Sequence, residues 1–188
     1  MQGKPLQSLL FPNYLHALES RPVRRIVILG TYHELQGSDK RLGNVSDPLY
    51  SILLGELFES EAVNFVFEEA SGFGSTTAER FANEILGAGC YLDVDPPLLR
   101  RKDLNISTPS NQPYMIGNPP DAGFANWQST EVHESREIFW SQTIQGSAFD
   151  SGLMVCGIAH MLSFAFRLRA ANFEVKAIDY LPRHKLEA

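Results

Sequence analysis

The sequence of 188 residues predicts an α/β fold, in which helices cover both faces of a mainly parallel sheet of about five or more strands. Five short apolar runs recur along the chain, several of them without the strict alternation of a half-exposed strand. Segments with helical periodicity separate these runs, so right-handed crossovers are expected between parallel strands. The length fits one domain over residues 1–188.

The five apolar runs give the expected strands in chain order. The first run ends at Gly30, and the second ends at the acidic pair Glu68 and Glu69. The third ends in a turn at Asp95, and the fourth ends at Gly157. The fifth is rich in β-branched and aromatic residues, which favour strands. The strands are expected at residues 25–29, 63–67, 90–94, 153–156 and 173–178.

Four segments carry helix signals. A proline at position 48 suits the first turn of a helix, and apolar residues then recur at helical spacing. Thr76 and Glu79 have the spacing of a capping box at the start of the next helix. The expected helices begin near Pro48, Thr76, Thr130 and His160, the third runs to about Gln145, and a further helix is expected around residues 12–19.

Residues 105–128 interrupt this alternation of strands and helices. The segment is rich in Asn, Pro, Gly and Ser and has no clear periodicity. A stretch of this length without secondary structure in a compact domain is typical of a functional loop. Because it contains Phe124 and Trp127, we expect an ordered loop that docks over the rest of the domain. The sequence therefore predicts a lid or substrate loop here.

The charge balance excludes several classes of function. Sixteen Lys and Arg against 22 Asp and Glu give a net charge of −6 and a pI near 5.3. This balance argues against nucleic-acid binding and against a polybasic membrane anchor. No apolar run approaches the length of a membrane span, and no secretory signal is evident. Two cysteines are too few for a disulfide framework. Together these features predict a cytoplasmic protein.

The pattern Gly-x-x-His occurs twice, each time directly after an expected strand. Gly30 and His33 follow the first strand, and Gly157 and His160 follow the fourth. In open parallel sheets, ligands bind outside the carboxyl ends of the strands. Glycine there lets the backbone turn sharply or approach a ligand or cofactor, and the histidine can overhang the crevice. One copy is typical of a structural histidine, whereas two copies at equivalent places favour a functional site.

Acidic residues lie at the same predicted edge of the sheet. Glu68 and Glu69 end the second strand, and the pleat sends adjacent side chains to opposite faces, so at most one of them is expected to point into the crevice. A carboxylate at this edge suits acid–base chemistry or metal binding. Asp95 is a weaker candidate, because acidic residues before proline often initiate turns.

Arg136 falls on the apolar face of the third expected helix. It lies four residues after Val132 and four before Trp140. One interpretation is an arginine that buries its stem and exposes its charged head. The other is a guanidinium that reaches into the site to hold a carboxylate or to stabilise an oxyanion. The spacing alone leaves both interpretations open.

In their order along the chain, these segments resemble the TraB/ChaN-like superfamily, which includes Tiki-type proteases and erythromycin esterases. The resemblance covers most of residues 24–181 and is carried by GTYH at 30–33, FEE at 67–69, ESREIFWSQTI around Arg136 and CGIAH at 156–160. The resemblance implies a shared site of two histidines, a strand-end glutamate and a helix arginine. Those residues would be His33, His160, Glu68 or Glu69, and Arg136.

The family activities include metal-dependent peptide cleavage, metal-independent ester hydrolysis and haem binding. The leading hypothesis is a hydrolase acting on an ester or peptide-type bond of a small molecule or short peptide. In a metal-free version, Glu68 or Glu69 orients a histidine that activates water, and Arg136 and the second histidine stabilise the oxyanion. In a metal-assisted version, His33, His160 and Glu69 bind Zn²⁺ or Mn²⁺. A locally cationic site would favour an anionic ligand.

Two other hypotheses remain open. The protein could bind haem or a small anion without turnover, with Tyr32, Tyr91 and Tyr114 contributing to the pocket. It could also be a degenerate member of the family that serves as an interaction scaffold. The sequence identifies neither the substrate nor the oligomeric state.

Overall fold

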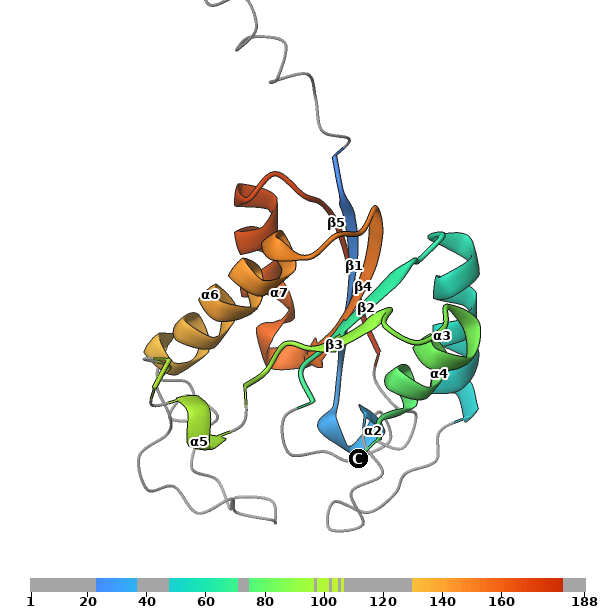
Figure 1. Ribbon diagram of the computed structural model, residues 1–188, viewed down its shortest axis with the longest axis horizontal. Helices are drawn as coiled ribbons and strands as arrows, with labels where there is room; N and C mark the ends of the chain where they lie inside the picture. Colours follow the sequence, from blue (N-terminus) through green and yellow to red (C-terminus); the bar gives the residue numbers. More distant parts are fainter. Residues whose placement is uncertain are drawn as a thin grey trace, which may run out of the picture.

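The computed structural model describes residues 23–36, 48–70, 75–96, 98–101, 103–104, 106 and 130–180, and within these the side chains of residues 33–34, 98–99 and 130–132 are not described. Five strands alternate with helices along the chain (Figure 1). In order, the elements are β1 (Arg25–Thr31), α2 (His33–Gln36), α3 (Pro48–Ser60), β2 (Phe65–Glu68), α4 (Thr77–Ile85), β3 (Tyr91–Asp93), α5 (Leu98–Arg101), α6 (Thr130–Gly146), β4 (Ser151–Gly157), α7 (Ile158–Ala170) and β5 (Glu174–Asp179).

The strands form one parallel sheet in the order β3-β2-β4-β1-β5. The predicted α/β fold with a parallel sheet of five strands is therefore confirmed. Strand β4 lies between β1 and β2 and is buried along its whole length, as expected from its apolar sequence. The register pairs Thr31 with Gly157, so the carboxyl ends of β1 and β4 lie side by side.

Helices pack on both faces of the sheet. Figure 1 shows α6 and α7 on one side and α3 and α4 on the other. Alternate strand residues supply the two cores: Ile26, Ile28 and Phe67 face α6 and α7, whereas Val27 and Val66 face α3 and α4. This period of two is the ordinary consequence of the β pleat, and it decides below where the strand-end carboxylates point.

Local signals place most helix starts correctly. Helix α3 begins at Pro48, and Thr76 caps α4 by accepting a hydrogen bond of 3.0 Å from the backbone N–H of Glu79. Helix α7 begins two residues earlier than expected, directly at the end of β4. The short helices α2 and α5 were not among the expected elements.

Two expected segments fall outside the described part of the chain. The helix around residues 12–19 lies there entirely, and so does the predicted lid at 105–128 apart from Ile106, which is buried. Among the described residues, no helix is long and apolar enough to cross a membrane.

Candidate functional site

Four side chains meet where β2, β3 and β4 end. Glu69 follows β2 directly, Asp95 lies just after β3, and His160 is the third residue of α7. Arg136, near the middle of α6, contacts all three of them. The chain thus brings Glu69, Arg136 and His160 together as predicted, and Asp95 joins them.

The guanidinium of Arg136 is the centre of this cluster. Its Nη2 donates to Glu69 Oε1 and to Asp95 Oδ2 at 2.9 Å, and its Nε donates to Asp95 Oδ1 at 3.1 Å. The side chain is only 14% exposed and lies over the Trp140 ring, 4.9 Å from its centroid. Burial opposes the charge, but the carboxylates of Glu69 and Asp95 outweigh burial and raise the pKa of Arg136. Arg136 therefore reaches into the site, and the solvent-exposed interpretation is wrong.

Glu69 faces α6 and α7, as the pleat requires for a residue two positions after Phe67. Its Oε1 accepts from Arg136, and its Oε2 accepts from the backbone N–H of Gly157 at 2.8 Å. Glu69 thus ties the guanidinium to the end of β4.

Glu68 lies on the opposite face of the sheet and takes no part in this cluster. Its Oε2 accepts from the hydroxyl of Thr76 at 2.5 Å and from the hydroxyl of Tyr91 at 3.0 Å. Complete burial raises the pKa of Glu68 to about 8, although the two hydrogen bonds from Thr76 and Tyr91 lower this pKa. Of the two predicted glutamates, Glu69 is therefore the one in the site, and the assignment of Glu68 to it is wrong.

Asp95 holds two arginines in place. Besides Arg136, it binds Arg101, whose Nη2 donates to Asp95 Oδ2 at 2.5 Å, and Trp140, whose Nε1 donates to Oδ1 at 3.3 Å. Arg101 and Asp95 are both buried. Because Glu69 and Asp95 balance these two guanidinium groups, the expected local excess of positive charge is not found among the described residues.

His160 is held from both ring nitrogens. Its Nδ1 lies 3.0 Å from Glu137 Oε1, and its Nε2 lies 3.3 Å from Arg136 Nη1. A guanidinium only donates, so Nε2 must accept and Nδ1 must carry the ring proton, which it donates to Glu137. The Trp140 ring meets the imidazole edge-on at 4.8 Å. The surroundings therefore fix both the orientation and the tautomer of His160.

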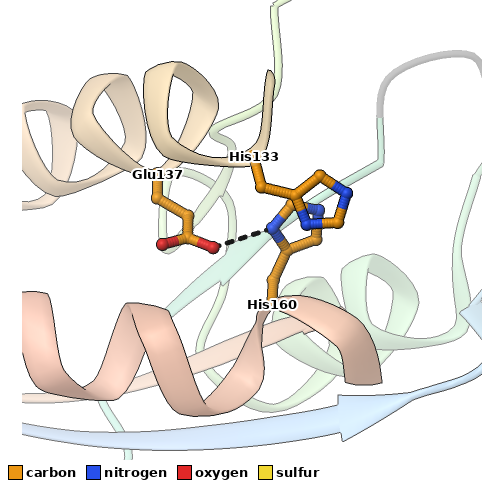
Figure 2. A group of neighbouring side chains, drawn as sticks. All are labelled: His133, Glu137 and His160. Carbon is orange, nitrogen blue, oxygen red and sulfur yellow. Dashed lines mark hydrogen bonds and ion pairs between the residues drawn. The ribbon is translucent and has the colours of Figure 1, made fainter. Parts of the chain in front are cut away.

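His133 and Glu137 complete the group and were not predicted. Figure 2 shows the His133 ring lying over the His160 ring, with Glu137 pointing to the near nitrogen of His160. The two ring centroids are 4.2 Å apart. Burial, with help from His160 and Arg136, lowers the pKa of the His133 imidazole. The spacing of His133 and Glu137, four residues on one helix, is a signal that could have been noticed in the sequence.

The predicted partner His33 begins α2 at the end of β1, next to the end of β4. Its side chain lies outside the described part of the structure, so its role stays a prediction. The same holds for the metal set of His33, His160 and Glu69. Within that set, both oxygens of Glu69 already accept hydrogen bonds from Arg136 and Gly157.

The two glycines of the repeated pattern, Gly30 and Gly157, make close contacts within the chain. A Cβ on Gly30 would lie 2.8 Å from the sulfur and 3.0 Å from the Cβ of Met161, so glycine here lets α7 pack closely on β1. The N–H of Gly157 is bound by Glu69. The cofactor-binding role of Gly30 and Gly157 stays a prediction.

Two of the three tyrosines named for a haem pocket lie in the described structure. Tyr32 lies between β1 and α2, whereas Tyr91 binds Glu68 on the other face of the sheet. Tyr114 lies outside the described residues. Haem binding stays a prediction.

No model of a known protein family matches the chain, and the search of curated proteins found no match. The resemblance to TraB/ChaN-like proteins therefore stays a prediction. Function is inferred below from the geometry of the Glu69, Asp95, Arg136, Glu137 and His160 cluster.

Proposed function

We propose that the protein is a hydrolase that cleaves an ester or peptide-type bond in a small molecule or short peptide, with His160 as general base. The observation that carries this proposal is the position of His160 between Glu137 at Nδ1 and Arg136 at Nε2. A carboxylate that fixes the imidazole tautomer is the usual support of a catalytic histidine. The proposal is further supported by the place of His160 at the carboxyl end of a parallel strand.

In the proposed reaction, the Nη1–H of Arg136 turns from Nε2 of His160 to the substrate carbonyl oxygen. The freed Nε2 then takes a proton from a water molecule as the water oxygen attacks the substrate carbonyl carbon. Glu137 stabilises the resulting imidazolium through the Nδ1–H bond. The tetrahedral intermediate then collapses, the bond from carbon to the leaving group breaks, and His160 returns the proton to the leaving oxygen or nitrogen. The products are an acid and an alcohol or amine, so atoms and charges balance.

Arg136 places a fixed positive charge beside the base, where the oxyanion of the intermediate forms. Its Nη1 is the guanidinium nitrogen nearest His160. Glu69 and Asp95 hold the other side of the guanidinium, so little reorganisation is needed during the reaction. Their charges also make a neutral acyl bond, rather than an anionic group, the feature that this site recognises.

The test is hydrolysis by purified protein of a panel of aryl esters, lactones and short peptides, before and after treatment with a chelator. We expect catalysed hydrolysis of at least one ester class, which the chelator does not lower because the proposed base needs no metal. Hydrolysis no faster than in buffer across the panel would contradict the proposal, and so would activity that the chelator removes.

A further inference from the structure

We propose that His133, Glu137 and His160 form a binding site for one Zn²⁺ ion. One possible ligand atom from each residue lies within 4.8 Å of the other two. The three side chains come from two packed helices, α6 and α7 (Figure 2). This inference goes beyond the proposed function, which uses no metal, and it shares only His160 with the metal set predicted from the sequence.

The helical spacing presents two of the ligands on one face. His133 and Glu137 are four residues apart on α6, so their side chains lie one turn from each other. His160 approaches from α7, with Nδ1 3.0 Å from Glu137 Oε1. Two ligand atoms around a tetrahedral zinc ion are about 3.3 Å apart, so this pair already has nearly the required separation.

His133 is the ligand that must move. Its ring stacks on His160 at an interplanar angle of 27°, whereas two imidazoles that bind one ion direct their lone pairs to a common point. The ligand atoms lie within 4.8 Å of one another, against about 3.3 Å around tetrahedral zinc, so the His133 nitrogen has to shift by at most about 1.5 Å. His133 is only half-buried, so its side chain can rotate. The other two ligands keep their positions.

The carboxylate is oriented by a second set of groups, as metal-binding carboxylates usually are. The Ser163 hydroxyl donates to Glu137 Oε1 at 2.7 Å. On the other oxygen, Arg167 Nε lies 4.0 Å from Oε2. Glu137 is 2% exposed, so its position is set by these contacts rather than by solvent.

The surrounding charge favours a cation. Around the site, four described carboxylates form ion pairs with three guanidinium groups. When both imidazoles are neutral, the sum of these charges is −1. Arg136, the nearest positive charge, is matched by Glu69 and Asp95. The carboxylates are Glu69, Asp95, Glu134 and Glu137, and the guanidinium groups are those of Arg101, Arg136 and Arg167.

The donor set selects the ion. Two imidazole nitrogens and one carboxylate oxygen suit Zn²⁺, whereas Mg²⁺ and Ca²⁺ prefer oxygen ligands alone. Three protein ligands leave a fourth tetrahedral position for water. Zinc would bind the Nδ1 that otherwise donates to Glu137, so a proton and the metal compete for this atom of His160. Bound zinc should therefore inhibit the proposed hydrolysis, which needs the Nδ1–H contact with Glu137.

The test is calorimetric titration of chelator-treated full-length protein with Zn²⁺, and with Mg²⁺ for comparison. We expect one zinc ion per chain and a loss of affinity of at least about 100-fold in each of the variants His133→Ala and Glu137→Gln. The matched control is Glu59→Gln, which removes an exposed carboxylate from α3 and leaves the three ligands and the charges around them intact. This control should bind zinc as the wild type does.

Absence of zinc binding would overturn the inference. Binding that survives both His133→Ala and Glu137→Gln would also overturn it, because the ion would then lie elsewhere on the chain. Since the titration uses the metal alone, its failure leaves the hydrolase proposal standing, and a failure of the hydrolysis panel leaves the zinc site standing.

Discussion

Changing His160 to Asn is expected to lower kcat for the hydrolysed substrate by about 10²- to 10⁴-fold, the usual contribution of a general base. The asparagine amide retains an N–H that can donate to Glu137, as Nδ1 does, but it has no second nitrogen to accept a proton. Because His160 acts on the attacking water rather than on substrate binding, KM should change little. Steady-state kinetics on wild type and variant measures both quantities.

A loss of activity because the variant unfolds must be distinguished from a loss of the catalytic base. His160 is 3% exposed, so the far-UV circular dichroism and the urea midpoint of the variant are measured alongside the kinetics. A folded variant that retains more than about a tenth of the wild-type kcat would contradict the role of His160 as base.

Glu68 is expected to make the protein less stable as pH rises. Its pKa is about 8 in the folded chain and near 4.5 in the unfolded chain. Between these values the folded state holds one more proton than the unfolded state, so the free energy of unfolding falls by about 1.4 kcal/mol per pH unit. Between pH 5.5 and 7.5, Glu68 therefore lowers the free energy of unfolding by about 3 kcal/mol.

The variant Glu68→Gln should remove this slope. Glutamine resembles the protonated acid, since its carbonyl oxygen can accept from Thr76 and Tyr91 as Oε2 does. Urea unfolding at several pH values should give wild type and variant similar stability at pH 5.5 and a more stable variant at pH 7.5. The control Glu59→Gln changes an exposed glutamate on α3 and should follow the wild-type curve. Parallel curves for wild type and Glu68→Gln would contradict the buried, protonated state.

The sheet was predictable because local patterns determine it. Short apolar runs ending in Gly or acidic residues gave all five strands, and the pleat implied that Glu68 and Glu69 point to opposite faces. Which of the two enters the site depends on which helices cover each face. That is a property of the chain crossovers, and no local pattern in residues 65–69 encodes it.

The cluster around Arg136 was predictable only in part. Arg136 was recognised as unusual because it lies on an apolar helix face. Its partner Asp95 lies 41 residues away in the sequence, in a segment with the ordinary pattern of a turn. Glu137 and His133 were missed because their significance depends on His160, which reaches them only when α7 packs on α6. Contacts between distant segments of this kind arise from tertiary packing.

The measurement that tests the central claim most directly is the ring tautomer of His160, determined by nitrogen-15 NMR of the imidazole at pH 8. The resonances are assigned by their absence from the spectrum of His160→Asn. The contacts to Glu137 and Arg136 predict a proton on Nδ1 and an unprotonated Nε2, the nitrogen that acts as base. A proton on Nε2 with a bare Nδ1 would contradict the proposed base, because the lone pair would then face Glu137 and Nε2 could not accept a proton from water.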